Sequence, residues 1–460
     1  MEQLTLAVAA AACVLVFCLP PAWWLAVYVA TLAWYPSYLT VKVGTLDFSA
    51  PRIVILAIYA SLFFRQHLLK RFRVTLPDTL VIAYFFCQLL AGAMTTDLPR
   101  LLENRSGAAF DMLLPYFAAR AIITDKQRYL SFLKASMYIV APMAIFGLYE
   151  SVTGHNPVGF LQKYMVWGSV ADFPTRHGLY RAWFIFSHPI MLGLFFAILG
   201  PLWAGLLRQA RTNRLMCYAG IALAGIGVFS SMSSGPLTAV LVATAFIALY
   251  RYRRYWKMAV AAIVLMCATI EIVSNRHFYY YPARFTFDLA TADYRGKLID
   301  VALFEGGMSG HWLAGYGIDT EAANEASATW AAKIGPRPTL DMVNHYLLIL
   351  FEYGLIGLVP FLAVIAAAAR KLVEAFRSSL LDSDKWLIWC LSASLAGQLV
   401  AYVTTSLHTG QANCLFFILL GLCGVMPVVI SDGNNWVLKS RLRQKVGYPP
   451  DARCFPEICR

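Results

Sequence analysis

Long apolar segments recur along most of this 460-residue chain, and they limit its possible folds more than any other feature. A segment of about 15–25 apolar residues can cross a hydrocarbon core of about 30 Å as one helix. Hydrophobic residues make up 59% of the chain and charged residues only 14%, which is unusual for a soluble protein. We therefore expect an all-α polytopic membrane protein.

Short basic clusters between the apolar segments predict the topology, because Lys and Arg in short loops stay on the cytoplasmic side of a membrane. The clusters are 65–73, 120–134, 208–214, 251–257, 370–385 and the tail after residue 438. If all of them share one side, the connections 95–110, 151–182, 231–236, 276–344 and 408–413 lie on the other. This pattern predicts about 12 transmembrane helices, with both termini cytoplasmic and one large extracytoplasmic loop.

The first 50 residues fit this pattern less simply. Pro20 and Pro21 divide residues 1–39 into two apolar pieces, which form either one broken span or a tight hairpin. Glu2 stands where a secretion signal would carry Lys or Arg, so we interpret this segment as the first membrane segment.

The chain divides into four predicted regions. The loop is rich in aromatic residues and glycines, and loops of its length usually have a role, so we expect a partly helical cap over the membrane. The regions are the N-terminal transmembrane helices (1–275), the large extracytoplasmic loop (276–344), the C-terminal transmembrane helices (345–431) and a basic cytoplasmic tail (432–460).

Composition also excludes some functions. The net charge of +13 is dispersed in short clusters between apolar segments, so it does not indicate nucleic-acid binding. Of the ten cysteines, eight lie in apolar segments, and none has metal-ligand spacing, so we expect no metal site. No Walker, HExxH or GxSxG motif is present, and we expect no cofactor. A transferase of this kind would have to use a donor that the membrane already holds.

The stretch DMVNHYLLILFEYG (341–354) places polar residues at the start of an apolar segment that we expect to continue as one span to residue 369. Polar groups at the rim of a bilayer usually serve a function, and Asn344, His345 and Tyr346 are candidates. His345 could act as a general base. Glu352, seven residues on, shares its helical face. The alternatives are a histidine that hydrogen-bonds the backbone at the helix entry and a structural ion pair for the glutamate.

Three arginines on the predicted external side, Arg181, Arg276 and Arg295, suit an anionic ligand, because guanidinium presents a fixed fork of donors to phosphate oxygens. Each could instead extend to the lipid headgroups. His188 could contact a ligand or could be a satisfied buried histidine beside Pro189.

Several motifs resemble the O-antigen ligase and polymerase superfamily of bacterial cell-envelope proteins. Tyr346-Leu347, Glu352, Gly354 and Gly357 are similar to its signature Asn-x-Tyr-Leu followed by Glu-x-Gly-x-x-Gly. Further matches in family order are GLYESVTGHNP (147–157), RAWFIFSHPIMLG (181–193), SMSSGP (231–236), and YRGKLID with GYGID (294–319). Many relatives have histidine where this chain has Val343, so the base would be His345.

The resemblance implies a metal-independent glycosyltransferase in the bacterial inner (cytoplasmic) membrane, acting in lipopolysaccharide or exopolysaccharide biosynthesis. Its donor would be an undecaprenyl-diphosphate-linked glycan, and its periplasmic acceptor either lipid A-core or a lipid-linked repeat unit. Arg181 and Arg295 would hold the diphosphate, with Arg276 in reserve, and His345 would deprotonate the attacking hydroxyl. The substitution at Val343 favours polymerase over ligase.

Two other classes remain open from the residues alone. A transporter also needs about a dozen helices and buried polar groups, although no inverted repeat is visible. A membrane scaffold would leave the external arginines without a purpose.

Overall fold

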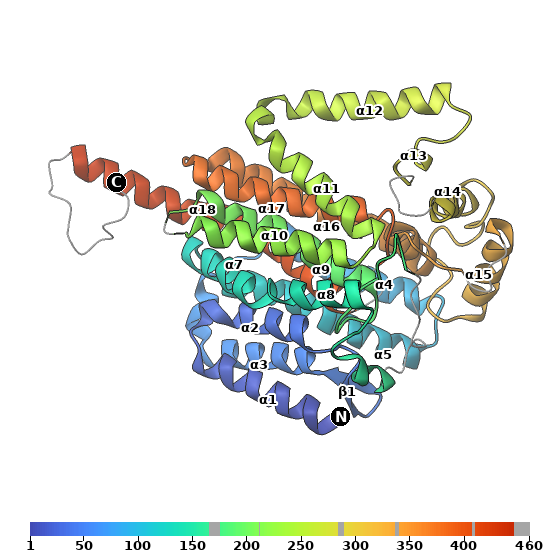
Figure 1. The fold of residues 1–460 in the computed structure, drawn as a ribbon, viewed down its shortest axis with the longest axis horizontal. Helices are drawn as coiled ribbons and strands as arrows, with labels where there is room; N and C mark the ends of the chain where they lie inside the picture. Colours follow the sequence, from blue (N-terminus) through green and yellow to red (C-terminus); the bar gives the residue numbers. More distant parts are fainter. Residues whose placement is uncertain (165–174, 211, 284–288, 336–339, 407–409, 446–460) are drawn as a thin grey trace.

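The computed structural model describes residues 1–164, 175–210, 212–283, 289–335, 340–406 and 410–445. The expectations for residues 408–409, for parts of the large loop and for the tail beyond residue 445 lie outside these residues. The described chain is mainly helical (Figure 1). Its α-helices are α1 (Glu2–Cys18), α2 (Pro21–Trp34), α3 (Ala50–Phe64), α4 (Leu76–Ala93), α5 (Leu98–Ala108), α6 (Leu114–Ile122), α7 (Lys126–Val140), α8 (Met143–Thr153), α9 (Pro189–Ala204), α10 (Arg214–Ser230), α11 (Ser234–Ala248), α12 (Trp256–Val273), α13 (Tyr280–Ala283), α14 (Leu289–Leu303), α15 (Glu321–Ile334), α16 (His345–Ser378), α17 (Asp382–Ala401) and α18 (Gln411–Lys445).

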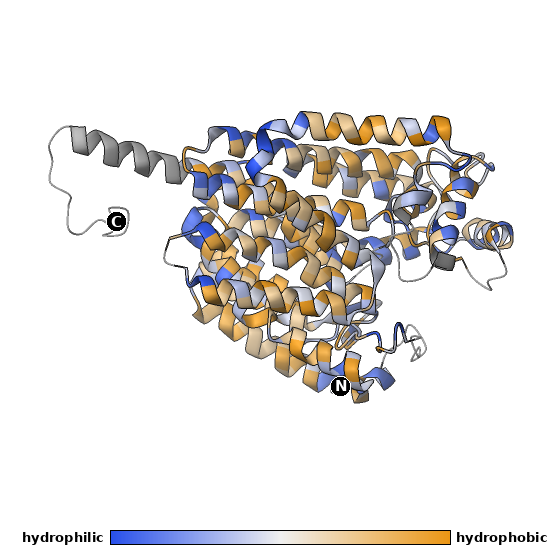
Figure 2. Ribbon diagram, turned by 45° about the horizontal axis from the view of Figure 1, so that its top comes forward, coloured by the Kyte–Doolittle hydropathy of each residue, from blue (hydrophilic) through white to orange (hydrophobic). Residues whose placement is uncertain are grey.

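Most of the long helices lie side by side in one bundle, with apolar residues along their middles and polar residues toward their ends (Figure 2). Six helical segments of the described chain are long and apolar enough to cross a membrane. These segments are Leu76–Ala93, Lys126–Thr153, Pro189–Arg208, Ser234–Val273, His345–Ser378 and Gln411–Ser431. This architecture is that of an all-α membrane protein.

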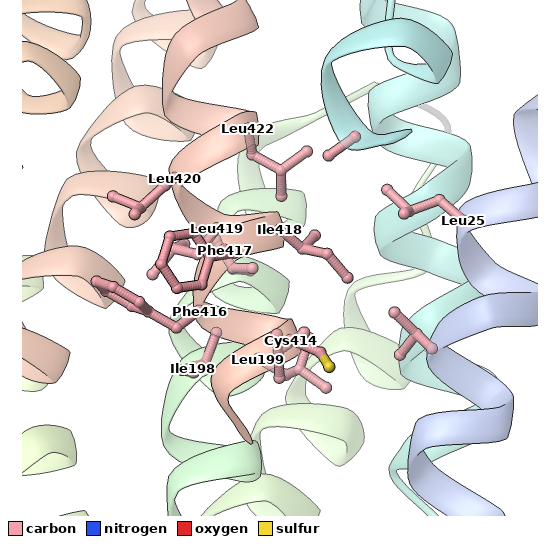
Figure 3. Packing of buried hydrophobic residues seen from close by; sticks show 14 of the residues in the cluster. Leu25, Ile198, Leu199, Cys414, Phe416, Phe417, Ile418, Leu419, Leu420 and Leu422 are labelled. Carbon is pink, nitrogen blue, oxygen red and sulfur yellow. The ribbon is translucent and has the colours of Figure 1, made fainter. Parts of the chain in front are cut away.

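Helix α18 lies in the core of the bundle. Its side chains between Cys414 and Leu422 pack against residues such as Leu25 of α2 and Ile198 of α9 (Figure 3). Small residues let α6 approach closely, since a Cβ at Gly421 would lie 2.7 Å from the carbonyl oxygen of Tyr116. The core is therefore set by close helix packing around one central helix.

The predicted cytoplasmic clusters meet at one end of the bundle. Arg208 and Arg253 both pair with Asp382, at 3.0 and 3.3 Å, and Lys126 pairs with Asp384. Arg120 donates to the carbonyl of Arg73 at 2.9 Å and pairs with the buried Asp78 at 2.7 Å. The clusters within 65–73, 120–134, 208–214, 251–257 and 370–385 thus share one end, as predicted.

The predicted external connections meet at the opposite end. Arg100 donates to the carbonyl of Asp319 at 3.3 Å, and Ile318 N donates to Thr96 Oγ1 at 3.2 Å. These bonds join the connection 95–110 to the large loop. In Figure 1, α13, α14 and α15 gather at this end.

The N-terminal segment forms a hairpin, α1 followed by α2, with its bend at Pro20 and Pro21. The bend lies at the basic end, where Arg65 donates to the carbonyl of Phe17 at 3.0 Å. The start of α1 lies at the other end, where Thr5 and Tyr35 hydroxyls are 2.8 Å apart. Of the two arrangements open for residues 1–39, the structure has the hairpin. The start of α1 and the basic clusters therefore lie at opposite ends of the bundle, whereas both termini were expected at the basic end.

A short β-hairpin connects α2 to α3 at the end opposite the basic clusters, and the all-α expectation omitted it. Strands β1 (Thr40–Val43) and β2 (Leu46–Ser49) pair antiparallel in the register Val43 with Leu46. Gly44 has φ of +64°, a conformation that suits glycine in a two-residue turn.

Helix α16 does not continue unbroken from His345, as the apolar pattern predicted. Gly354 has φ of +59° and ψ of −157°, which separates a short arm, His345–Tyr353, from the rest of α16. The rings of His345 and Phe361 are 5.5 Å apart, whereas an unbroken helix would separate these positions by about 24 Å. The arm therefore folds back over the membrane helix.

Residues 312–317 of the large loop provide the hydrogen bonds that the break at Gly354 interrupts. Leu355 N and Ile356 N donate to the carbonyls of Trp312 and Leu313, at 2.8 and 3.1 Å. The amides of Tyr316 and Gly317 donate in turn to Phe351 and Glu352, at 2.7 and 3.2 Å. Glycines permit this contact, since a Cβ at Gly354 would lie 2.3 Å from Leu313 O and one at Gly315 2.6 Å from Phe351 O. The motifs GYGID and Glu-x-Gly thus pack against each other.

We predict that Gly354→Ala destabilises the protein by about 2–5 kcal/mol, because the backbone conformation is nearly restricted to glycine and the new methyl group meets the loop backbone. Thermal unfolding of the detergent-solubilised protein measures the effect. Gly225→Ala in α10 is the matched control, since its Cβ would have no atom within 4 Å. Equal melting temperatures for the two variants would contradict this account of the break.

Candidate functional site

His345 and Glu352 line the same cavity, of about 460 Å³, at the end of the bundle that carries the large loop. The short arm of α16 presents both side chains, while α4, α5 and the large loop supply the facing walls. The polar residues that line this cavity are Tyr84, Gln88, Asn104, Arg105, Asp111, Asp319, His345, Glu352, Tyr353 and Asn413. We call it the His345 cavity.

The fold fixes the position of His345 from several directions. Its backbone N–H donates to the carbonyl of Tyr402 at 2.8 Å, and its ring lies 4.7 Å from the ring of Tyr402. The preceding residue, Asn344, is the N-cap of α16 and accepts from the amides of Tyr346 and Leu347, at 3.0 and 3.1 Å. The Tyr346 hydroxyl donates to Leu399 O at 2.9 Å. Asn344 and Tyr346 therefore hold the arm that carries His345.

Arg105 is a residue of this cavity that the sequence analysis missed. It is 7% exposed, donates to Gln88 Oε1 at 2.7 Å, and lies over the ring of Tyr353 at 4.9 Å. Its Nε is buried without a hydrogen-bond partner among the described residues. Arg105 thus brings a positive charge to the cavity that also contains Glu352. Its sequence context, LLENRSG, gave no signal beyond its place in a predicted external connection.

Arg181 belongs to a second cluster, on the serine-rich turn between α10 and α11. Its Nη2 donates to Ser233 Oγ at 3.1 Å, and Arg176 donates to the carbonyl of Met232 at 2.8 Å. Burial and the neighbouring Arg176 lower the pKa of Arg181 to about 10. Arg181 therefore remains a cation at neutral pH, within a partly desolvated pair of arginines.

His188 lies beside this cluster and acts as the N-cap of α9, where its Nδ1 accepts from Ile190 N at 3.1 Å. Burial, followed by the charges of Arg181 and Arg176, lowers the pKa of His188 to about 3. The imidazole is therefore neutral at physiological pH, and its role in the structure is to cap α9.

Glu150 holds the chain segment that carries Arg181, and the sequence analysis assigned it no role. Its Oε2 accepts from the amides of Phe184 and Trp183, at 2.8 and 3.3 Å, while Oε1 accepts from Asn156 at 3.1 Å. The motifs GLYESVTGHNP and RAWF are thus joined through one buried carboxylate.

The arginine cluster and the His345 cavity meet the same short segment, residues 401–405. A Cβ at Gly235, at the start of α11, would lie 2.2 Å from Thr405 Cγ2, so the serine-rich turn packs on this segment. His345 bonds to Tyr402 in the same segment. The two features therefore lie at one end of the bundle, although Arg181 is not part of the described lining of the His345 cavity.

The other two predicted arginines differ in their surroundings. Arg295 is 8% exposed on α14, next to Tyr294, whose hydroxyl bonds both the N–H and the carbonyl of Asp341. Arg276 lies on the surface and pairs with Asp293 at 3.4 Å. Neither is part of the described lining of the His345 cavity.

Residues 219–362, from α10 into α16, match the family model for O-antigen ligase. Over this part of the chain, the match supports the resemblance to the O-antigen ligase and polymerase superfamily. The matched segment contains Ser233, Arg295, His345 and Glu352, whereas Arg181 precedes it. A comparison with curated proteins finds no significant match. The matched domain and the apolar helices together indicate a membrane protein that processes glycans.

We predict that Asn344→Ala lowers the stability by about 1 kcal/mol, because two amides at the start of α16 lose their acceptor. Asn344→Ser is the matched control, since a serine hydroxyl can also cap a helix. Thermal unfolding compares the three proteins. If Asn344→Ala melts with the wild type yet loses activity, Asn344 contacts substrate instead of holding the helix.

Proposed function

We propose that the protein is a membrane glycosyltransferase that transfers an undecaprenyl-diphosphate-linked glycan to an acceptor sugar on the periplasmic face. The observation that carries the proposal is the placement, in a chain with an O-antigen ligase domain, of an imidazole and a carboxylate in one cavity, with a half-buried pair of arginines at the same end of the bundle. These groups lie at the end of the bundle opposite the basic clusters, which supports an external site.

The diphosphate would be held by Arg181, supported by Arg176. Breaking the bond between sugar and diphosphate develops negative charge on phosphate oxygens, and preorganised cations in a desolvated site stabilise that charge. Arginine suits this role because its guanidinium stays protonated and can bond two oxygens at once. Arg295 is a further candidate, and Arg276 a reserve contact at the surface. In this proposal the arginines replace a metal ion.

His345 would accept the proton from the attacking hydroxyl of the acceptor, which requires hydrogen-bonding distance between its ring and that hydroxyl. Glu352 faces the same cavity and would stabilise the protonated imidazole, while Arg105 offsets its charge when the imidazole is neutral. The proton and the leaving diphosphate would thus be handled by separate groups.

Ligase and polymerase differ in the acceptor, lipid A-core or the next lipid-linked repeat unit. We favour the polymerase because of Val343. Analysis of glycans in a deletion strain distinguishes the two: single repeat units on the carrier indicate a lost polymerase, and long chains stranded on the carrier a lost ligase. The inner-membrane location, about 12 spans, a cytoplasmic C-terminus and the four-region division are part of the same proposal.

We predict that His345→Ala and Arg181→Ala each lower transfer by about 10²–10³-fold, because one removes the base and the other a phosphate contact. The assay uses protein in nanodiscs with undecaprenyl-diphosphate glycan and candidate acceptors, in EDTA, with products identified by mass. His67→Ala and Arg251→Ala, exposed residues at the basic end, are matched controls that should retain activity. Full activity of either site variant, or inhibition by EDTA, would contradict the mechanism.

We predict that Arg181→Lys is active near neutral pH and loses transfer as the pH rises through a range in which the wild type is unaffected. Burial and Arg176 lower the pKa of a cation at this position. Lysine starts from a lower pKa than arginine, so it deprotonates and loses its charge first. Rate against pH for the two proteins measures this difference. Parallel profiles would show that the charge at residue 181 is not needed.

A further inference from the structure

A second cavity, of about 630 Å³, lies at the external end between the β-hairpin and helices α2 and α3. It shares Asp111 with the His345 cavity and is also lined by Ser187, which precedes His188. Ser187 belongs to the segment 181–188, which also carries Arg181 of the arginine cluster. The second cavity therefore adjoins both parts of the site described above. We call it the hairpin cavity.

Asp111, at the junction of the two cavities, is held in a fixed orientation. It is 4% exposed and accepts two hydrogen bonds from Arg52, at 3.1 and 2.8 Å. Arg52 also donates to the carbonyl of Asp47 in the hairpin at 2.8 Å. Asp111 lies in a π-helical turn, Ala109–Leu113, a local structure that is frequent at functional sites. The paired carboxylate can still accept bonds at its remaining lone pairs.

The lining of the hairpin cavity suits sugar hydroxyls better than phosphate. Lys42 and Arg52 are balanced by Asp47, Glu103 and Asp111, so the charges offer no excess of cations to a diphosphate. Hydroxyl and amide groups complete the lining, and they can both donate and accept hydrogen bonds. This mixture matches the alternating donors and acceptors of a sugar ring.

Tyr38 gives an independent indication of a polar ligand. It lines the hairpin cavity, and its hydroxyl is buried without a hydrogen-bond partner among the described residues. A buried hydroxyl without a partner is costly, and native proteins rarely leave one unsatisfied. A sugar hydroxyl in the cavity would provide the missing partner.

The hairpin cavity is formed by parts of the chain that the family model does not cover. Its lining comes from residues 28–52, 103–111, 187 and 410–414, whereas the O-antigen ligase match spans 219–362. A cavity outside the matched segment can differ between proteins that carry the same domain. The hairpin cavity therefore has both the position and the composition to recognise the glycan of this particular protein.

We propose that the hairpin cavity is a saccharide-binding subsite, which recognises sugar rings of the glycan and selects the glycan that is used. This inference rests on the proposed transferase function. The sugar could belong to the donor or to the acceptor, and both present the same ring hydroxyls.

Binding of free glycans tests the subsite without turnover. The probes are the oligosaccharide repeat unit released from the host's lipid carrier by mild acid and, separately, the lipid A-core oligosaccharide. Saturation-transfer NMR with the full-length protein in nanodiscs gives Kd for each probe. Binding of the repeat unit alone places the donor glycan or a growing chain in the cavity, and binding of the core oligosaccharide alone places the acceptor of a ligase there.

Two substitutions probe the cavity without removing a contact of the fold. Thr45 is an exposed residue of the hairpin turn that lines the cavity, and Thr45→Trp should fill part of it and weaken binding at least about tenfold. Val43→Trp, at an exposed position on the same hairpin outside the lining, should bind as the wild type does. Tyr38→Phe should weaken binding about fivefold by removing one hydroxyl, and Tyr138→Phe on α7 is its control.

His345→Ala separates the two proposals, because it should bind free glycan normally while failing to transfer it. If binding falls in Thr45→Trp and Tyr38→Phe but the wild type transfers no glycan, the subsite is supported and the transferase function is overturned. If the wild type transfers glycan and these variants bind it unchanged, the subsite is overturned and the function stands. A wild type that binds neither probe also overturns the subsite.

Discussion

Backbone N–H and C=O groups inside a bilayer must find partners within the protein, because lipid offers none. Helix α16 breaks at Gly354, and residues 312–317 supply four hydrogen bonds across the break. The break lets the arm His345–Tyr353 fold back, and the arm brings His345 and Glu352 into one cavity. The position of the candidate base thus depends on how a loop satisfies the backbone of a membrane helix.

The distribution of charge divides the site into two kinds of environment. Arg176 and Arg181 form a half-buried cationic pair on the serine-rich turn. In the adjoining cavities the cations are accompanied by carboxylates, as in the bidentate contact between Arg52 and Asp111. A lipid-linked glycan has the same division, with a charged diphosphate beside hydroxyl-rich rings. This correspondence supports the assignment of the two parts to different portions of one substrate.

The sequence predicted the features that depend on local composition. Apolar segments indicated the helices, and Lys and Arg clusters indicated which connections lie together, because both patterns reflect the solvent around each segment. The break at Gly354 could not be predicted, since the apolar pattern continues through it and its cause is a loop about 40 residues earlier. The glycines of both motifs were visible, but the contact that requires them was not.

Residues that act through distant partners were also missed. Arg105 is placed in the His345 cavity by its contacts with Gln88 and Tyr353. Glu150 accepts hydrogen bonds from the amides of Trp183 and Phe184. The basic clusters indicated which connections share an end of the bundle, but not the end at which α1 starts. The bend of the N-terminal hairpin has no basic residues of its own and meets Arg65 only in space. The described structure places His345 and Glu352 together and leaves Arg276 at the surface.

The four hydrogen bonds across the break also couple the large loop to α16, so that the two move together. The loop amides of residues 316 and 317 bond the carbonyls of Phe351 and Glu352, near the end of the arm. A displacement of the loop therefore moves the arm, which carries His345 at its other end. A displacement of the large loop would therefore change the position of the His345 ring in its cavity.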